Sequence, residues 1–237
     1  SVSSDNDALF ESLDVSNNGT TGSVSYRGKT GTVGTATVTV TVKDNGGTAN
    51  GGVDTYSRTF VVTINPLPVL AINSDKGNIV SKGEVVFLTA TGASNYAWTG
   101  NNGIVNGANS AELQIRPTVT TTYTLTGTNS SGCSETQTFT VTVLDDLAKI
   151  KATNILTPNN DGYNDKWVID NIDVYPENDV KVFDKAGRIV YTKKGYDNSW
   201  DGQMNGTALN EGTYYYVIDF GQGKRKIRGY ITVIRNN

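Results

Sequence analysis

The sequence contains no histidine, and its only cysteine is Cys133. Without histidine, a His-based acid–base site and a Ser-His-Asp triad are both excluded, and Cys133 has no histidine to activate it. A single cysteine cannot form an intrachain disulfide. We therefore expect a protein that is not an enzyme, has no catalytic residues and does not depend on disulfides.

Long apolar runs are missing too. No stretch approaches the roughly 20 residues that a membrane-spanning helix needs. No signal peptide is visible, and Ser1 to Leu9 is polar, so we expect a piece of a longer chain. The net charge of −3 argues against a nucleic-acid partner. Apolar residues do not recur at helical spacing, whereas Val, Thr and Tyr favour strands and Gly and Asn favour turns. The composition predicts an all-β protein.

Two polar linkers divide the chain. Asn65-Pro66-Leu67-Pro68 is a stiff, extended connector, and Asp145 to Lys151 is a second short one. Charge supports the second boundary, because residues 1–146 carry a net charge of −5 and residues 147–237 one of +2. The predicted domains are tandem Ig-like β-sandwiches, the first one incomplete, with bounds 1–65, 66–146 and 147–237.

The first predicted domain contains few clear strands. Thr35–Val42 alternates Thr and Val as a half-buried strand does, Thr59–Ile64 is a second strand, and Ser23–Tyr26 is weaker. Since these are too few for a closed sandwich, we expect an incomplete sheet with an exposed edge. The run Val40–Gly47 resembles the Ig-like or cadherin-like repeats of bacterial surface adhesins.

The middle predicted domain has short strands at regular spacing, which favours a β-sandwich around Trp98. The expected strands are Val69–Ile72, Val85–Ala90, Ala97–Thr99, Ala111–Ile115, Thr122–Thr128 and Thr138–Leu144. The run Pro117–Tyr123 resembles Ig-like repeats that precede sorting domains in secreted Bacteroidota proteins. Those relatives often carry paired cysteines, so Cys133 is either buried as a small apolar side chain or has lost its partner.

The last predicted domain has strands at Trp167–Ile169, Val180–Phe183, Arg188–Tyr191, Thr213–Phe220 and Lys226–Ile234. Thr213–Phe220 is apolar on both faces, so we expect it to be central and covered on both sides. The final strand is expected at the sheet edge, where its free backbone groups suit pairing with a partner.

Five ordered runs in this domain resemble the gliding-motility-associated C-terminal domain, the type B sorting domain of the type IX secretion system. The runs are Thr157–Asp165, Val180–Tyr191, Trp200-Asp201-Gly202, Gly212–Ile218 and Arg228–Arg235. The resemblance implies an Ig-like sandwich, export across the outer membrane, a cell-surface or extracellular location, and a PorP/SprF-like outer-membrane protein as partner beside the secretion machinery. The family usually has an Asn-Arg-Trp-Gly-like turn where this chain has Asp184–Gly187.

A candidate metal site lies in the first of these runs. Asn159, Asp161, Tyr163 and Asp165 alternate around Gly162, as oxygen ligands do in the first half of a calcium loop. The distal Glu of an EF-hand is missing. The alternative is an Asx-turn network, in which Asn and Asp side chains bind nearby backbone N–H groups.

A candidate partner site lies near the C-terminus. Its residues are Lys224, Arg225, Lys226, Arg228 and Tyr230. The basic side chains either keep an edge strand soluble or are recognised by the export machinery.

We expect a cell-surface adhesin whose last domain directs export and attachment. Its upstream repeats are expected to serve as stalk or adhesive modules with an unknown glycan or protein ligand, and gliding motility is a process in which such an adhesin acts. The alternative is a carbohydrate-binding and sorting appendage of a secreted polysaccharide hydrolase.

Overall fold

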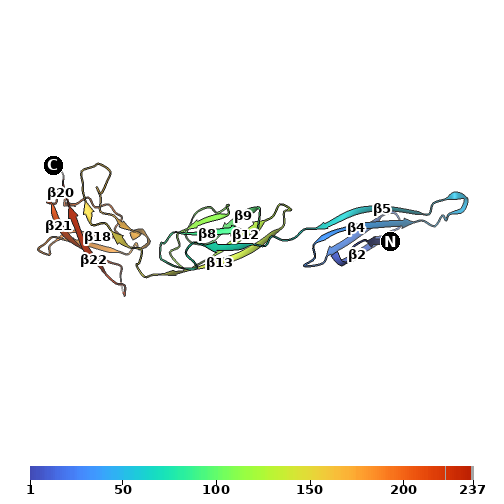
Figure 1. The fold of residues 1–237 in the computed structure, drawn as a ribbon, viewed down its shortest axis with the longest axis horizontal. Helices are drawn as coiled ribbons and strands as arrows, with labels where there is room; N and C mark the ends of the chain where they lie inside the picture. The colour runs from blue at the N-terminus through green and yellow to red at the C-terminus, as the bar shows by residue number, and fades with distance from the viewer. Residues whose placement is uncertain (222, 236–237) are drawn as a thin grey trace. The chain divides into compact units, whose positions relative to one another are not determined.

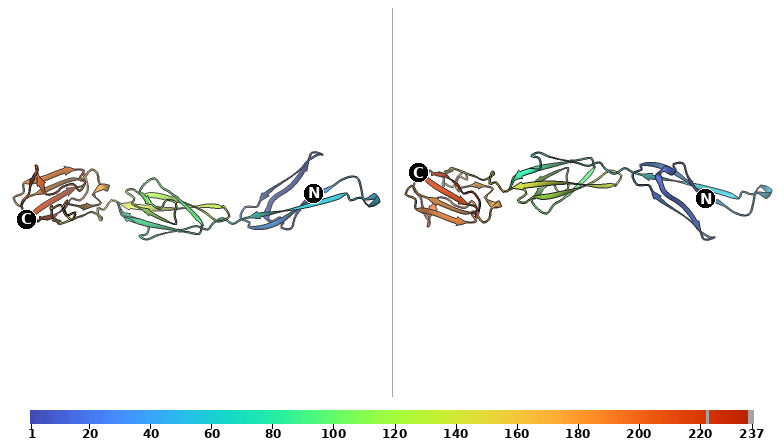
Figure 2. Two further views of the ribbon diagram at one scale, coloured as in Figure 1. Left: turned by 90° about the horizontal axis from the view of Figure 1, so that it is seen from above. Right: turned by 90° about the horizontal axis from the view of Figure 1, so that it is seen from below.

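The computed structural model describes residues 1–221 and 223–235. It is all-β, as expected: the helical elements in this described part are three single 3-10 turns, η1 (Asp7–Leu9), η2 (Ala49–Gly51) and η3 (Ile172–Val174). Figures 1 and 2 show the strands gathered into separate small sheets. The chain forms two compact units. The first unit comprises Ser1–Ala71, Thr91–Tyr96 and Thr126–Gln137. The second unit comprises Ile72–Ala90, Ala97–Leu125 and Thr138–Asn237. The predicted three-domain division stays a prediction.

Residues 1–64 form two small sheets, drawn in blue to cyan in Figure 1. Their strands are β1 (Val2–Ser4), β2 (Phe10–Asn17), β3 (Gly22–Gly28), β4 (Gly34–Lys43) and β5 (Thr55–Ile64). One sheet has the order β1-β4-β5, and β2 pairs with β3 alone. In β4 the Thr/Val alternation buries Ala36 and Val38, as a strand with one covered face should.

The prediction for this segment missed β1 and β2. Strand β1 is only three residues long. Strand β2 (Phe-Glu-Ser-Leu-Asp-Val-Ser-Asn) has no continuous apolar alternation, because Phe10 is out of phase with Leu13 and Val15. Its pairing with β3 correspondingly shifts register between Phe10 and Ser12. The sheets remain small, with Leu9, Ala36, Val38 and Val62 as their buried apolar side chains.

Residues 71–144 contain two four-stranded sheets, with orders β10-β11-β8-β6 and β7-β13-β12-β9. The strands are β6 (Ala71–Ser74), β7 (Ile79–Ser81), β8 (Val86–Thr91), β9 (Asn95–Thr99), β10 (Ile104–Asn106), β11 (Glu112–Ile115), β12 (Thr121–Thr128) and β13 (Ser134–Leu144). Trp98 is buried as predicted, and its indole N–H donates to the Ser110 carbonyl at 2.9 Å. Cys133 is a free thiol that is only partly buried, so of its two alternatives the structure does not favour burial as a small apolar side chain.

Residues 151–233 are built on a five-stranded sheet of order β15-β22-β21-β17-β18. The strands are β14 (Lys151–Ala152), β15 (Ile155–Leu156), β16 (Ile169–Asp170), β17 (Asp179–Phe183), β18 (Ile189–Lys194), β19 (Gln203–Met204), β20 (Thr207–Ala208), β21 (Gly212–Asp219) and β22 (Ile227–Val233). β21 is central, as predicted. Its inner face buries Tyr214, Tyr216 and Ile218 against Trp167 and its neighbours.

Two predictions about this sheet were wrong. β21 is not covered on both sides, because Tyr215 on its outer face is 52% exposed. β22 is not the outermost strand, because β15 pairs with its end at Thr232 and Val233. The two residues of β15 were too few to be recognised in the sequence. Gln222, between the expected strands Thr213–Phe220 and Lys226–Ile234, lies outside the described residues, as do Asn236 and Asn237.

Candidate functional site

The stretch Asn159–Asp165, here the Asn/Asp loop, is closed at its base by Thr157. The Thr157 backbone N–H donates to the Asn164 carbonyl at 2.8 Å. The Thr157 hydroxyl donates to the Tyr163 carbonyl at 3.1 Å. Pro158 then fixes the chain direction into the loop.

The carboxylate of Asp165 is the acceptor around which the loop folds. Its Oδ1 accepts the backbone N–H of Asn159 at 3.0 Å and that of Asn160 at 2.5 Å. Its Oδ2 accepts the N–H of Gly162 at 2.8 Å. Asn160 and Gly162 have φ values of 63° and 90°, in the left-handed region that Asn and Gly tolerate best. Residue choice and hydrogen bonding therefore specify the same tight turn.

Asp161 makes the second half of the network. Its Oδ1 accepts the Tyr163 N–H at 2.7 Å, and its Oδ2 accepts the Asn159 side-chain amide at 2.9 Å. The side-chain oxygen of Asn159, Oδ1, in turn accepts the Asp161 backbone N–H at 3.2 Å. The Tyr163 N–H, and then the Asn159 amide, hold the pKa of the Asp161 carboxyl below its usual value.

The structure thus brings the four predicted calcium ligands into one loop, but their oxygens already accept hydrogen bonds from the loop itself. Across residues 1–221 and 223–235 no group of three or more His, Cys, Asp or Glu side chains could hold a metal ion. These contacts are those of the Asx-turn alternative, and the geometry needs no cation to hold it. The calcium hypothesis stays a prediction.

An aromatic cluster lies directly after the loop. Trp167 is fully buried, with ring centroids 4.9 Å from Tyr216, 5.5 Å from Tyr196 and 6.2 Å from Trp200. Its indole N–H donates to the Thr153 carbonyl at 2.8 Å, and its own carbonyl accepts the Tyr196 hydroxyl at 2.6 Å. Burial raises the pKa of Tyr196. The loop is therefore anchored on a packed, hydrogen-bonded core.

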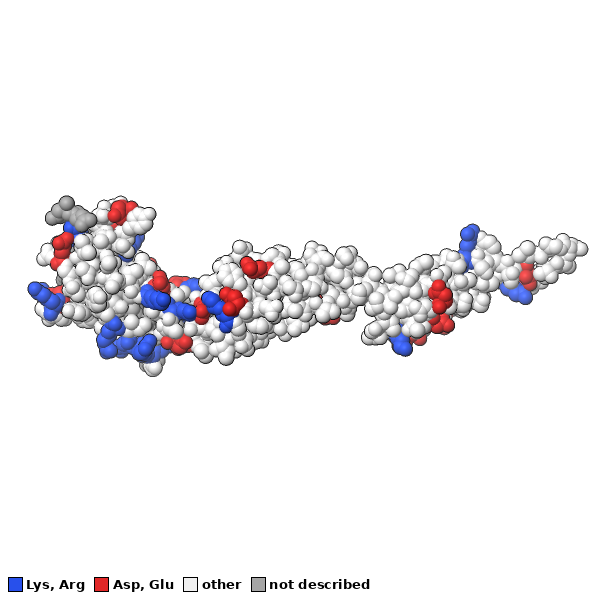
Figure 3. Space-filling model, in the orientation of Figure 1, with Lys and Arg blue, Asp and Glu red and all other residues white. Residues whose placement is uncertain are grey.

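The surface of the predicted partner site is less uniformly basic than its sequence suggests, because two of its lysines pair with carboxylates. Lys224 pairs with Asp145 at 2.5 Å, and Lys226 pairs with Asp219 at 2.6 Å. The hydrogen bond from Lys226 is the main reason why the pKa of Asp219 lies below its usual value. Arg225 and Arg228 are exposed, and no ion pair of either is found in the described part. Figure 3 likewise shows red and blue atoms interspersed over this end of the chain.

The outer face of the five-stranded sheet carries an apolar row, of which the sequence analysis named only Tyr230. Tyr230 lies opposite Tyr215, Tyr215 lies opposite Phe183, and Phe183 lies opposite Ile189. Tyr230, Tyr215 and Ile189 are 51%, 52% and 48% exposed. We call these four residues the outer row. Its sequence signal was the presence of Tyr215 and Val217 between the buried positions of β21.

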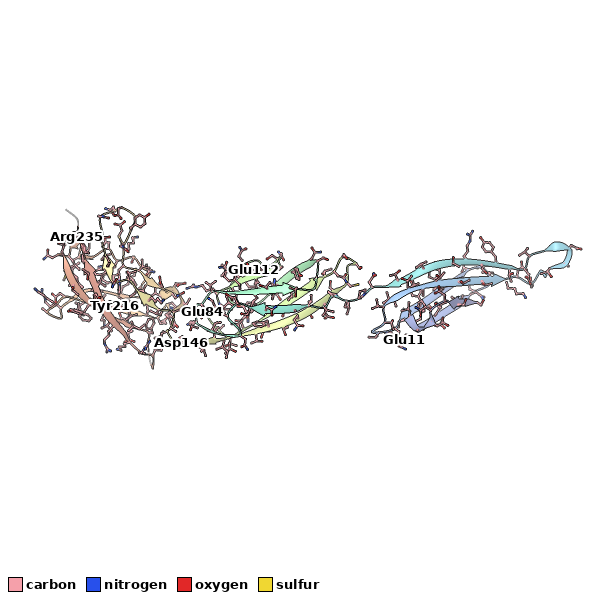
Figure 4. All side chains as sticks on the ribbon, viewed as in Figure 1. Glu11, Glu84, Glu112, Asp146, Tyr216 and Arg235 are labelled. Carbon is pink, nitrogen blue, oxygen red and sulfur yellow. The ribbon has the colours of Figure 1, made fainter. Side chains whose placement is uncertain are left out.

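Arg235 is a second residue that sequence reasoning missed, although it ends the run Arg228–Arg235. Its guanidinium donates to the Leu209 carbonyl at 2.8 Å and to the Gly202 carbonyl at 3.1 Å. Its backbone N–H donates to Glu211 at 2.6 Å. Figure 4 labels Arg235, just after β22, and Tyr216, on β21. Arg235 thus fixes the end of β22 to the loops beside it.

In the part of the chain that the structure describes, no helix is both long and apolar enough to cross a membrane. Residues 150–233 match the profile of the CHU_C type IX secretion signal domain. The match implies export and a cell-surface or extracellular location. No curated protein matches the chain.

Three solved structures are similar at low identity. The first is the Bacteroides ovatus mixed-linkage glucan utilization locus protein SGBP-B in complex with a heptasaccharide, with 18% identity over 90% of this chain and 55% of that chain and a TM-score of 0.31. The second is protocadherin gamma B2 cadherin domains 3–6, with 11% identity over 85% of this chain and 57% of that chain and a TM-score of 0.26. The third is dimeric latent PorU from Porphyromonas gingivalis, with 12% identity over 99% of this chain and 29% of that chain and a TM-score of 0.25. The chain spans about half the length of the first of these. The likenesses are too weak to carry an argument about function.

Proposed function

We propose, from the type IX secretion signal domain at residues 150–233, that this chain belongs to a cell-surface adhesin whose last domain directs its own export and surface attachment. The upstream β domains act as stalk or adhesive modules, and the surface they contact is a glycan or a protein. A role in gliding motility is part of the same proposal. The match of the last domain is the observation that carries it.

The side chains that this sequence provides support a display role more than a catalytic one. The chain has no histidine, and its single cysteine is half-buried in a hairpin. The face seen in Figure 3 carries few charges over the upstream sheets. Such surfaces suit extended modules that hold a binding element away from the cell.

The proposed export partner is a PorP/SprF-like outer-membrane protein that works with the type IX machinery. Arg225 and Arg228 support this role, since both side chains are exposed and are available to an acidic partner. Lys224 and Lys226 are occupied by Asp145 and Asp219, so they contribute less to such recognition. Exposed ion pairs contribute only about 0.2–1 kcal/mol each, so replacing any of the four leaves the fold intact.

The second candidate, a carbohydrate-binding appendage of a secreted hydrolase, is favoured by one observation. Tyr215 and Tyr230 expose aromatic side chains on a single sheet face. A glycan array on the whole chain separates the two candidates. Binding that is lost in a Tyr215→Ala, Tyr230→Ala variant favours the appendage.

Charge variants of a reporter fusion test the export proposal. A fluorescent protein is fused before the whole chain, and surface display is measured by protease accessibility on intact cells. We expect Arg225→Ser with Arg228→Ser to weaken display. The matched control, Lys224→Ser with Lys226→Ser, should display nearly normally. Deleting Gly229–Asn237 also blocks display, but it removes the buried Ile231 and Val233 and so unfolds the domain as well. Equal display of both charge variants and the parent would confine recognition to shape and backbone.

A further inference from the structure

The two edges of β22 are occupied very differently. One edge pairs with β21 along the whole strand, from Ile227 opposite Ile218 to Val233 opposite Gly212. Within the described residues, the other edge pairs with β15 alone. There the Thr232 N–H donates to the Asn154 carbonyl at 2.8 Å, and the Ile234 N–H donates to the Leu156 carbonyl at 3.0 Å.

The open part of this second edge runs from Ile227 to Ile231. Backbone groups of alternate residues point to opposite edges of a strand, so those of Arg228 and Tyr230 point the same way as those of Thr232. Within residues 1–221 and 223–235 the outward N–H and C=O groups of Arg228 and Tyr230 have no hydrogen-bond partner. Four backbone hydrogen-bonding groups are therefore directed away from the sheet.

The chain's own pairing shows that this edge accepts a strand, and it also shows why that pairing covers only the end of β22. β15 binds the edge in parallel at Thr232 and Val233. Upstream of β15 the chain leaves the edge, because Lys151 and Ala152 pair instead with β16. A strand from elsewhere has room to pair with the edge beyond the point where β15 begins, opposite Ile227–Ile231.

The open segment lacks two of the features that protect an edge. It contains no proline, its pairing with β21 shows no bulge, and Arg228 is its one charged side chain. Gly229 faces the interior of the domain and not an approaching partner. A Cβ at Gly229 would lie 2.4 Å from the Tyr216 hydroxyl, so its lack of a side chain is needed by the core.

Side chains next to this edge supply a recognition pattern. Tyr230 begins the outer row, so an apolar side chain on an added strand would extend the row by one strand. Arg228 lies on the same face two residues earlier, beside Val217, and is exposed. A carboxylate on the added strand would complement its charge.

We propose that the edge Ile227–Ile231 binds an extended strand of the outer-membrane export partner by β-augmentation. The strand carries an Asp or Glu beside Arg228 and, two positions away on the same face, an aromatic or β-branched residue beside Tyr230. This deepens the proposed export function and rests on it for the source of the strand. A second copy of the chain is a poorer occupant, because it would bring Arg225 and Arg228 of both copies together.

Two variants at one position separate backbone pairing from side-chain loss. Tyr230→Pro removes an outward N–H without touching the bonds to β21, and proline is tolerated at such edge positions. Tyr230→Val removes the same side chain and keeps the N–H. Circular dichroism and thermal unfolding of the whole chain establish that both variants fold.

The probe is an acetylated Thr/Val peptide with one Glu and, two positions later, one Tyr, and its binding to the whole chain is followed by fluorescence anisotropy. We expect Tyr230→Pro to weaken binding by about tenfold or more, and Tyr230→Val to weaken it far less. Arg228→Glu should reverse the preference between this peptide and its Glu→Lys counterpart. No binding, or equal binding by both Tyr230 variants, overturns the proposal, as does dimerisation of the chain through this edge.

Display of the reporter fusion gives a second, independent readout. Loss of display in Tyr230→Pro with display retained in Tyr230→Val supports the proposal. Normal display of both variants, or failure of both, contradicts it. If the unmodified fusion is not exported, the export function itself fails, and the peptide measurement still decides whether the edge accepts a strand.

Discussion

Replacing Asp165 by Ala should destabilise the last domain by about 2 kcal/mol. The change removes the shared acceptor of the Asn159, Asn160 and Gly162 N–H groups. A hydrogen bond contributes about 0.5–1.5 kcal/mol net, and more to a charged group. The donors are exposed and can turn to water, so we assign each bond to the lower part of that range. Asp161→Ala removes the acceptor of the Tyr163 N–H and of the Asn159 side-chain amide, and should destabilise the domain less than Asp165→Ala does.

The assay is urea unfolding of the whole chain followed by tryptophan fluorescence, since Trp167 lies two residues after Asp165. Hydrogen exchange adds a local readout, because the amides of Asn159, Asn160 and Gly162 should lose protection in Asp165→Ala. Asp165→Asn, which keeps one acceptor oxygen, should fall between the parent and Asp165→Ala.

The same experiment with a calcium chelator tests the alternative. The hydrogen-bond account expects an unchanged unfolding midpoint in the parent and in both Ala variants. A chelator-induced drop in the parent that Asp161→Ala abolishes would establish a metal site. A loss below about 0.5 kcal/mol in Asp165→Ala would refute the central role given to that carboxylate.

Three further outcomes follow from the packing. Gly229→Ala should lower the urea midpoint by an amount equivalent to about 1–3 kcal/mol, because its methyl overlaps Tyr216; an unchanged midpoint would contradict the close approach. Trp167→Phe should cost about 2–4 kcal/mol in the same titration, since it leaves a cavity and an unpaired Thr153 carbonyl, and a loss under about 1 kcal/mol would argue against that core. Burial raises the pKa of Tyr123 to about 12. The contribution of the buried, neutral Tyr123 to the stability of the folded state is therefore complete below about pH 10 and is lost as pH rises through about 12. Tyr123→Phe should flatten the alkaline fall in melting temperature, and the same fall in both proteins would exclude this cause.

Local chemistry was predictable from the sequence where partners are close along the chain. The Asx-turn alternative for Asn159–Asp165 depends on donors and acceptors within six residues of each other. The alternation in β4 and the turn Asp184–Gly187 were visible for the same reason: the Asp184 N–H bonds to the Arg188 carbonyl at 2.9 Å.

Features that depend on distant segments were not predictable. Lys224 looked like part of a free basic patch because its partner, Asp145, lies 79 residues away. The exposure of Tyr215 could not be read from alternation, which separates two strand faces but does not say whether a second layer covers each. β15 could not be predicted because two residues carry no periodicity. The division of β22 into a paired end and an open edge could not be predicted either, since it depends on β15.

The most direct test of the account compares two reporter fusions of similar size. One carries residues 147–237 after a fluorescent protein, and the other carries residues 66–146, which also form β-sheets but lie outside the secretion-signal match. Both are expressed in cells with and without a functional type IX translocon, and surface fluorescence sensitive to added protease is measured. The account predicts display only for residues 147–237 and only when the translocon works. Display of the 66–146 fusion, or translocon-independent display of the other, would contradict it.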